Sequence, residues 1–397
     1  MRVIGMMSGT SYDAVDAAAA ELTLTGDTLA LRPLGLVSAG YPPALRAALA
    51  AALPPAATTL HEVCRLDTGV GRAFAEVAVR ADRELCGGRA DLVVSHGQTV
   101  YHWVEGGRVH GTLQLGAPAW IAEATGRTVV SDLRTRDVAA GGQGAPLVSL
   151  VDVLWLSGRP GRPVALNLGG IANVTVAAGP AGPAGPVAFD TGPGNALVDA
   201  AVRLVTDGAR DIDEDGALGA RGRVDPALLR RLLAEPYYAA PAPKTTGKEL
   251  FHAEYLRAAL TAHGAPVAAA DLVATVTRLT AETVAGAVRG LGGTEVVASG
   301  GGVRNPTLTA MLRAALGRIP LRVSDELGLP AAAKEAYAFA VLGFLTVLGL
   351  PGTLPGCTGA RGARVLGSLT PGAGGLRLPE PAAAAPVRLD VLPPPWP

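Results

Sequence analysis

The chain begins MRVIGMMSGTSYDAVDAAAAELTL (residues 1–24). Two apolar runs, residues 2–7 and 14–24, flank a short segment that is rich in glycine, hydroxyl and carboxylate side chains. Apolar runs of this length around a glycine-bearing turn predict two strands joined by a hairpin. A plain turn needs only one or two glycines, so the polar side chains indicate a ligand site, with an ordinary polar hairpin as the alternative.

The same arrangement returns later in the chain. VALNLGGIANVTV (residues 164–176) again places a glycine turn between two apolar runs, and EVVASGGGVRNP (residues 295–306) follows an apolar run with three glycines. This recurrence predicts an α/β protein with two similarly built lobes that face one cleft. Open α/β sheets bind ligands at the polar ends of buried strands. The absence of a repeat of about 20–50 residues argues against a solenoid or a propeller.

Apolar periodicity, with glycine and proline as breakers, predicts the remaining elements. We expect buried strands at residues 92–95 and 128–131, and helices at residues 42–53, 60–86, 120–125 and 150–156. The segment GPAGPAGP (residues 179–186) is predicted to be a surface loop. The proline-rich tail from residue 371 is predicted to be poorly ordered or to lie along the surface.

The composition excludes several classes of protein. The 397 residues carry 34 basic and 34 acidic side chains, a balance that argues against nucleic acid as a partner. Cys64, Cys86 and Cys357 lie far apart, which indicates neither a disulfide framework nor a zinc site. The longest charge-free apolar run, residues 336–350, is shorter than the ~20 residues that span a bilayer, and the N-terminus lacks a signal-peptide pattern. We therefore expect a soluble cytoplasmic protein with no membrane partner.

The turn after the first strand is the first candidate site. Successive N–H groups of a glycine-bearing turn can hold phosphate oxygens, and Thr10 and Ser11 can donate further hydrogen bonds. Asp13 or Asp16 could hold Mg²⁺ through water. The segment lacks the GxxxxGK[ST] pattern, so it is not a Walker P-loop.

The segment AFDTGPGNALVDA (residues 188–200) supplies the second candidate site. We expect Asp190 at the tip of a short strand that ends at Phe189, followed by a turn and a helix that begins near Asn195. This position suits a general base, and the helix N-terminus beside it suits phosphate. Alternatively, Asp190 is an Asx-turn or N-cap residue.

An arginine-bearing loop is the third candidate. Arg134 and Arg136 lie between Asp132 and Asp137 and precede GGQG (residues 141–144). Guanidinium groups suit a carboxylate or phosphate ligand. Internal pairing of these arginines with the aspartates, which would order the loop, is the alternative.

Three weaker signals complete the set. Glycines 300–302 would let a flat ligand such as adenine approach, or only form a tight turn. Lys244 and Lys248, two of only three lysines, indicate a point-charge role or simply exposed side chains. Glu335 lies at the start of a predicted helix. A negative charge there interacts favourably with the helix dipole, so this position has an explanation whether or not Glu335 is functional. The nearby histidines lack metal-site spacing and indicate ordinary polar roles: His96, His102 and His110.

The sequence resembles the anhydro-N-acetylmuramic acid kinases of bacterial peptidoglycan (cell-wall) recycling. The resemblance rests on nine segments in this order: GMMSGTSYDAVD, SHGQTVYH, QLGAPAWIAEATG, VVSDLRTRDVAAGGQGAPL, LNLGGIANVT, FDTGPGNALVDA, PKTTGKELF, GGGVRNP and AKEAYAFAVLGF. It implies two ribonuclease-H-like lobes, the actin-like ATPase/sugar kinase fold, around a central nucleotide cleft. Lobe I would comprise residues 1–149 and 337–372, lobe II residues 150–336, and the tail residues 373–397.

The resemblance also implies site residues. Asp190 matches the catalytic aspartate and Glu335 a supporting catalytic glutamate, while Arg134 and Thr112 match substrate-contacting positions. The ATP-binding positions would be Gly9, Thr10, Ser11, Tyr12, Asp13, Ala14, Val15, Asp16, Gly169, Gly170, Asn173, Gly192, Gly194, Gly300, Gly301 and Asn305. Ala14 and Lys248 depart from the family, which usually has glycine and arginine there.

The implied reaction uses ATP and Mg²⁺. Water, activated by Asp190, would open the bridge of 1,6-anhydro-N-acetylmuramic acid, and the freed O6 would accept the γ-phosphoryl group. The implied partners are the sugar and ATP, and a homodimer is left open. The alternatives are a kinase of another anhydro sugar such as levoglucosan, an ATP-binding chaperone or filament protein of the same fold, and an anhydro-sugar hydrolase.

Overall fold

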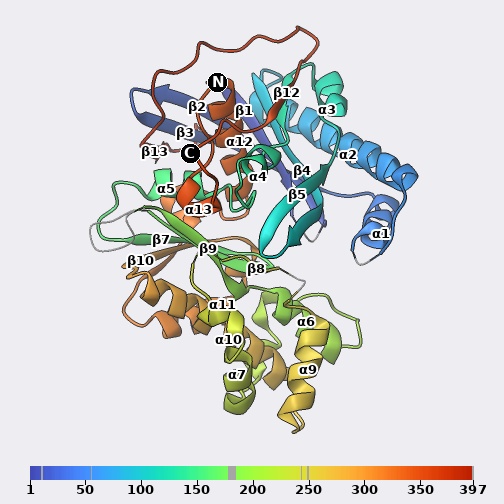
Figure 1. Cartoon of the computed structure of the whole chain (residues 1–397), viewed down its shortest axis with the longest axis vertical. Helices are drawn as coiled ribbons and strands as arrows, with labels where there is room; N and C mark the ends of the chain where they lie inside the picture. The colour runs from blue at the N-terminus through green and yellow to red at the C-terminus, as the bar shows by residue number, and fades with distance from the viewer. Residues whose placement is uncertain (10–11, 55, 178–184, 243, 248–249, 396–397) are drawn as a thin grey trace. The chain divides into compact units, whose positions relative to one another are not determined.

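The structure is a computed structural model that describes residues 1–9, 12–54, 56–177, 185–242, 244–247 and 250–395 (Figure 1). The chain divides into two compact units. Unit 1 comprises Met1–Ser157 and Ala333–Pro397, and unit 2 comprises Gly158–Ala332.

Unit 1 is built on an eight-stranded sheet in the order β12-β6-β4-β1-β2-β3-β13, with β5 paired to β4. Its strands are β1 (Arg2–Ser8), β2 (Ala14–Thr25), β3 (Thr28–Gly40), β4 (Leu92–Glu105), β5 (Arg108–Leu115), β6 (Thr128–Ser131), β12 (Ser368–Thr370) and β13 (Arg388–Val391). Its helices are α1 (Pro43–Ala52), α2 (Leu60–Cys86), α3 (Pro118–Thr125), α4 (Thr135–Ala139), α5 (Ser149–Leu156), α12 (Lys334–Val347) and α13 (Pro355–Thr358).

Unit 2 is built on a five-stranded sheet in the order β11-β10-β7-β8-β9. Its strands are β7 (Pro163–Leu168), β8 (Ile171–Val176), β9 (Val187–Pro193), β10 (Glu295–Ser299) and β11 (Leu321–Val323). Its helices are α6 (Ala196–Val205), α7 (Pro226–Leu233), α8 (Pro236–Ala239), α9 (Ala253–His263), α10 (Ala269–Gly290) and α11 (Pro306–Leu316). Four 3₁₀ turns lie at η1 (Glu214–Gly216), η2 (Gly219–Arg221), η3 (Gly301–Arg304) and η4 (Ser324–Leu327).

The two sheets share one strand order. In unit 1 the first three strands are antiparallel neighbours, and β4 and β6 then continue the sheet parallel to β1. In unit 2 β7, β8 and β9 are antiparallel neighbours, and β10 and β11 continue parallel to β7. This order, three antiparallel strands followed by two parallel ones, is the ribonuclease-H-like arrangement. The prediction of two similarly built α/β lobes is confirmed.

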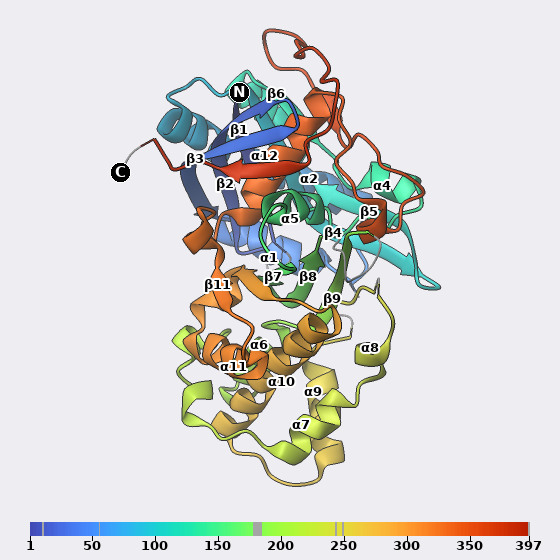
Figure 2. The same cartoon turned by 90° about the vertical axis from the view of Figure 1, so that its left-hand side faces the viewer.

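Helices cover both faces of the unit 1 sheet, which explains why β1 is apolar on both sides. Helices α2 and α12 lie on opposite faces of this sheet (Figure 2). Ile4 and Met6 pack with residues of α2 in one core, and Gly5 faces α12. Parallel strands buried on both faces read as continuous apolar runs. The local signals at the ends of α2 also agree with the sequence, because Thr59 caps its first turn and Gly87 ends it with φ 62°.

Unit 2 has two apolar cores that share α10. One core packs the sheet against α10 and α11, and it includes Leu166, Val296 and Leu312. The other core is formed between helices α6, α7, α9 and α10. Because α10 contributes to both cores, it fixes the helical layer to the sheet that carries the glycine turns.

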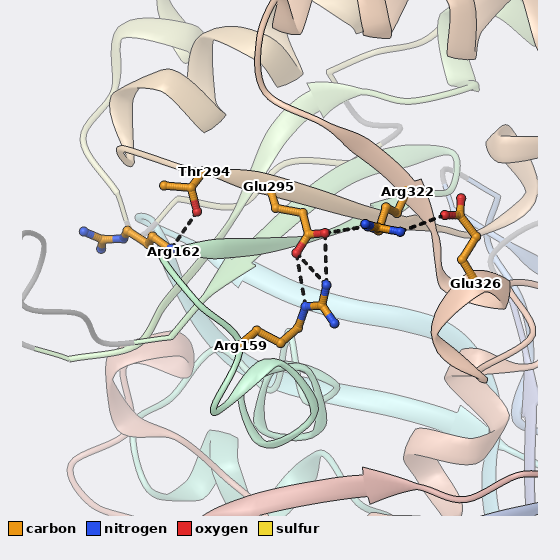
Figure 3. A network of polar contacts seen from close by, with 6 residues as sticks. All are labelled: Arg159, Arg162, Thr294, Glu295, Arg322 and Glu326. Atoms are coloured by element: carbon orange, nitrogen blue, oxygen red, sulfur yellow. Dashed lines mark hydrogen bonds and ion pairs between the residues drawn. The ribbon is translucent and has the colours of Figure 1, made fainter.

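An ion-pair network ties the first residues of unit 2 to the parallel end of its sheet (Figure 3). The Arg159 guanidinium donates from Nε and Nη2 to the Glu295 carboxylate at the start of β10, at 2.9–3.1 Å. Arg322 on β11 donates to the same carboxylate at 2.7 Å and also pairs with Glu326. The network therefore connects three segments that are far apart in the sequence.

The structure corrects four expectations. β4 runs from Leu92 to Glu105 instead of ending at residue 95, because its second half pairs with β5. β9 runs past Asp190 to Pro193, because β8 pairs with it throughout. The tail contributes β13, which pairs with β3. Residues 150–157 and 333–336 group with unit 1, whereas the sequence-based bounds place them in lobe II.

Most of the GPAGPAGP loop lies outside the described residues, so its predicted conformation stays a prediction. Among the helices of the described residues, none has the length and apolar character needed to cross a membrane.

We predict that Gly5→Ala destabilises unit 1. A Cβ at Gly5 would collide with the backbone of Ala336 and Ala340 in α12, and backbone atoms cannot swing aside as a side chain can. Overpacking of this kind costs about 1–3 kcal/mol, measurable as a lower midpoint of thermal or urea unfolding. Gly111→Ala is the matched control, because its Cβ would meet only an ordinary contact at 3.7 Å from Trp103. Equal destabilisation by the two substitutions would contradict the packing explanation.

Candidate active site

The turn between β1 and β2 is braced by its neighbours. The Gly9 carbonyl accepts hydrogen bonds from Tyr12 N–H and from the Gln98 side chain on β4, both at 3.1 Å. Ser8 Oγ donates to the Ala14 carbonyl at 2.8 Å and so closes the base of the hairpin. Tyr12 has a φ of 44°, in the left-handed region that non-glycine residues seldom occupy. The predicted donors Thr10 and Ser11 lie outside the described residues.

The two carboxylates of this segment have different surroundings. Asp13 forms an exposed ion pair with Arg46 of α1, with 2.6 Å between Oδ1 and Nη2. Asp16 lies within β2, opposite Met7 of β1, and its charge acts on Glu335. The other two predicted positions, Ala14 and Val15, are the first residues of β2, and the Val15 side chain is buried in the core. Asp16, not Asp13, is therefore the carboxylate on the Glu335 side of the hairpin.

Glu335 lies in the first turn of α12, beside a buried ion pair. Lys334 Nζ pairs with the Asp152 carboxylate of α5, and the two side chains are only 3% and 6% exposed. Burial raises the pKa of Glu335, and the charges of Asp152 and Asp16 act in the same direction. The positive charges of Lys334 and Arg134 lower it. Glu335 and Arg134, predicted from distant segments, are thus close enough in unit 1 to influence each other's ionisation.

Arg134 is held by two neutral acceptors. Its Nε donates to Nε2 of His96 at 2.8 Å, and its Nη1 donates to the Gly144 carbonyl at 2.6 Å. His96 lies at the inner half of β4 and stacks on Phe339 of α12, with 4.6 Å between ring centroids. The sequence offered His96 only an ordinary polar role, so its contact with Arg134 was missed.

Hydrogen bonds to Asp137 order the arginine-bearing loop. Asp137 is fully buried; its Oδ2 accepts from Gly144 N–H and its Oδ1 from the Thr358 hydroxyl, each at 2.8 Å. Arg136 is exposed. In the described residues, the predicted pairing of these arginines with the aspartates is therefore not found, and Arg134 instead donates to His96 and Gly144.

Thr112 lies on the polar face of the β4–β5 hairpin. Its hydroxyl accepts from Gln114 Nε2 at 2.7 Å and is 3.2 Å from Nδ1 of His102. Burial lowers the pKa of His102, and the charge of Arg134 adds to this effect. Thr112, His102 and Arg134 therefore belong to one region of unit 1, together with Glu335.

In unit 2, the segment after α8 fixes Asp190. Thr245 Oγ1 donates to Asp190 Oδ2 at 2.8 Å, and Thr246 N–H donates to the same oxygen at 3.0 Å. The backbone of Asp190 is held as well, by the Tyr237 hydroxyl and the Lys244 carbonyl. Asp190 lies inside β9, opposite Asn173 of β8, so the Asx-turn and N-cap alternative does not hold.

Lys244 anchors this segment. Its Nζ donates to the carbonyls of Tyr237 and Tyr238, both at 2.9 Å, and burial lowers its pKa. The positive charge of Lys244, for which the sequence predicted a point-charge role, therefore holds backbone carbonyls of unit 2 in place. Lys248, the second lysine of the motif, lies outside the described residues.

At the start of α6, three backbone N–H groups have hydrogen-bond acceptors within the chain. Gly194 N–H and Ala196 N–H donate to the Gly170 carbonyl, and Asn195 N–H donates to the Gly169 carbonyl, at 2.8–2.9 Å. The glycine turn between β7 and β8 thus supplies the acceptors for these backbone donors. Helix starts need such acceptors, and here the chain provides them itself.

The triple-glycine turn packs closely on β7. Gly300 has a φ of 86°, and a Cβ there would collide with Asn167 and Leu168, so only glycine fits. Gly301, in contrast, is exposed, with open space where a Cβ would lie. Asn305, a predicted ATP-binding position, caps α11 by accepting a hydrogen bond from Leu308 N–H. Gly192 rests against the Tyr238 ring.

The predicted residues form two sets. Unit 1 brings together Asp16, Arg134, Thr112 and Glu335, and unit 2 brings together Asp190 with Asn173, Gly192 and Gly194, as well as Gly169 with Gly170. Within the described part of the chain, three or more His, Cys, Asp and Glu side chains are nowhere grouped to hold a metal ion.

Two ribonuclease-H-like units in one chain define the actin-like ATPase and sugar kinase class of folds. Residues 1–372 match the sequence model of the family described as "Anhydro-N-acetylmuramic acid kinase". The chain belongs to this family.

Curated relatives of the same name are similar over nearly their whole length. A protein of Streptomyces avermitilis is 69% identical over 389 residues, which cover 98% of this chain and 99% of the relative. One of Rhodococcus erythropolis is 63% identical over 398 residues, which cover 99% of this chain and the whole relative. Among solved structures, a ROK family glucokinase from Streptomyces griseus in complex with glucose and AMPPNP is similar at 12% identity, with 86% of this chain and 98% of that chain covered and a TM-score of 0.37.

We predict that Lys334→Met destabilises the protein by about 3–5 kcal/mol, because it leaves the buried Asp152 carboxylate without this partner. Urea unfolding measures the loss. The matched control is Arg46→Met, which breaks the exposed pair with Asp13 and should cost less than about 1 kcal/mol. The double variant Lys334→Met/Asp152→Leu should recover much of the stability, and similar losses for the buried and the exposed pair would refute the interpretation.

Proposed function

We propose that this chain is an ATP-dependent kinase of 1,6-anhydro-N-acetylmuramic acid. It opens the anhydro bridge with water and transfers the γ-phosphoryl group of ATP to O6, giving N-acetylmuramic acid 6-phosphate and ADP. This reaction would return a cell-wall sugar to metabolism in peptidoglycan recycling. The observation that carries the proposal is Asp190, a carboxylate fixed by Thr245 and Thr246 within a chain that belongs to this kinase family.

Asp190 is the proposed general base. It takes a proton from water while the water oxygen attacks the anomeric carbon, and the bond from that carbon to O6 breaks. Two hydrogen bonds to Oδ2 fix the orientation of the carboxylate, which a base needs in order to reach its proton. The freed O6 then attacks the γ-phosphorus, and ADP leaves.

Residues of unit 1 complete the proposed machinery. Glu335 supports the reaction, and Arg134 and Thr112 contact the sugar. The β1–β2 turn holds ATP phosphates by backbone N–H groups. Mg²⁺ would arrive with ATP and neutralise phosphate charge. Asp16 suits it better than Asp13 as a ligand through water, because Arg46 already engages Asp13.

Residues of unit 2 would contact the nucleotide. The exposed Gly301 offers the open backbone that a flat base needs, and it is the best of the predicted positions for this role. Gly169, Gly170 and Asn305 are proposed to act indirectly, because their hydrogen-bonding groups shape the turns at the starts of α6 and α11.

The first test measures the substrate directly. Purified protein with ATP and Mg²⁺ should phosphorylate 1,6-anhydro-N-acetylmuramic acid, with the phosphate mapped to O6 by NMR. A faster reaction with levoglucosan would favour the alternative sugar, and bridge opening without ADP release would favour a hydrolase.

We predict that Asp190→Asn lowers turnover by a factor of ~10² to 10⁴, the usual contribution of a general base, while ATP binding persists. Steady-state kinetics measure turnover, and calorimetry with ATP is the control for the fold. Near-normal turnover would remove Asp190 from the mechanism.

Thr245 gives a finer test of the same site. Thr245→Val keeps the shape but removes the hydroxyl that donates to Asp190, so turnover should fall by roughly tenfold, the effect of one hydrogen bond to a charged group. Thr245→Ser keeps the donor and should stay within about threefold of the original turnover. Equal losses in both variants would show that the hydroxyl does not orient the base.

A further inference from the structure

The contact between Arg134 and His96 is unusual because the acceptor of the arginine carries no negative charge. Arginine side chains in binding sites are commonly oriented by carboxylates, which also neutralise them. Here the hydrogen bonds of Arg134 go to an imidazole nitrogen and a backbone carbonyl. Within the described residues, Arg134 forms no ion pair, although the charges of Glu335 and Asp137 act on it from farther away.

The tautomer of His96 follows from its partners. Arginine can only donate hydrogen bonds, so Nε2 of His96 must accept from Arg134 Nε. The proton of the neutral ring therefore lies on Nδ1, which donates to the Gly97 carbonyl at 2.8 Å. Burial, together with the charge of Arg134, lowers the pKa of His96 to about 3. The ring therefore stays neutral at any ordinary working pH.

The packing around His96 leaves it little freedom. The ring is 5% exposed and stacks on Phe339, and its Nδ1 is fixed by the neighbouring carbonyl. The charged groups that face Arg134 are Glu335 and Asp137. Oδ2 of Asp137 accepts a hydrogen bond from Gly144 N–H, and Oδ1 accepts one from the Thr358 hydroxyl. Asp137 therefore orders the loop.

We propose that His96 is a positioning residue that orients the Arg134 guanidinium without neutralising it, so that Arg134 can select a sugar that carries a carboxylate. A carboxylate at position 96 would orient Arg134 equally well but would compete with the carboxylate of the substrate. An apolar residue at position 96 would leave the charge of Arg134 but would not orient its guanidinium group. A neutral histidine orients the guanidinium group and preserves its positive charge. This inference rests on the proposed function and names the specificity element within it.

The test uses three substitutions and two substrates. His96→Gln keeps a neutral acceptor, His96→Glu makes the acceptor anionic, and His96→Phe keeps the ring but removes the acceptor. The substrates are 1,6-anhydro-N-acetylmuramic acid and 1,6-anhydro-N-acetylglucosamine, which has the same bicycle without the lactyl carboxylate. KM and kcat are measured for each sugar, with KM for ATP and the thermal midpoint as controls.

We expect a selective effect on KM. His96→Phe and His96→Glu should raise KM for the carboxylate-bearing sugar about ten- to hundredfold, the range for a hydrogen bond to a charged group, and leave KM for the neutral sugar within about threefold. His96→Gln should stay within about threefold for both sugars. His110→Gln, on the exposed part of the hairpin, is the control for a histidine that does not touch Arg134.

Each outcome decides the proposal. Equal rises of KM for both sugars, or a His96→Glu variant that keeps the original preference for the anionic sugar, would overturn it. If His96→Phe fails to fold, His96→Gln and His96→Glu still decide, because they differ mainly in charge. A wild-type protein that phosphorylates neither sugar would refute the proposed function, whereas one that uses both sugars equally well would refute only the role of His96.

Discussion

The close contact between β1 and α12 is the constraint on which the rest of unit 1 depends. Gly5 lets the backbone of α12 approach the sheet at Ala336 and Ala340. Glu335 precedes this contact by one residue, so the depth of the helix sets the position of its carboxylate. Phe339 lies one turn further on and packs against His96. One glycine in the first strand thus controls both the acidic and the basic part of the proposed sugar site.

In unit 2, a loop instead of a helix positions the carboxylate of the proposed site. Asp190 lies in β9, the edge strand of the sheet, and Thr245 and Thr246 donate hydrogen bonds to its carboxylate. The segment at residues 244–246 supplies the hydroxyl and N–H donors, and Lys244 fixes that segment through two carbonyls of α8. The hydrogen bonds that orient the proposed base therefore depend on a loop whose own position depends on the half-buried ammonium group of Lys244.

The sequence predicted the elements well where apolar periodicity is strong. The hairpin at the N-terminus, the helix at residues 60–86 and the recurrence of strand–turn–strand in both halves follow directly from it. It failed where pairing partners decide. β4 and β9 continue through polar residues because neighbouring strands satisfy their backbones, which is information that a single segment does not contain.

The candidate site was predictable in its charges but not in its contacts. Asp190, Arg134 and Glu335 stand out as charged groups beside glycine turns or at a helix start. His96 does not stand out, because its importance lies in a hydrogen bond to a residue 38 positions away. The glycine pair 169–170 has a structural role that its sequence does not reveal. Its carbonyls accept hydrogen bonds from backbone N–H groups at the start of α6.

The charged groups of the described residues divide by the partners that hold them. Lys334 with Asp152, and Arg159 with Glu295, are paired with opposite charges and join segments that are distant in sequence. Arg134 is held by neutral groups, although its surroundings are as crowded. A directly paired charge has little attraction left for a ligand, whereas a charge held by neutral acceptors keeps more of its attraction for an anion. For Arg134, the neutral acceptors therefore agree with the proposed role in binding an anionic sugar.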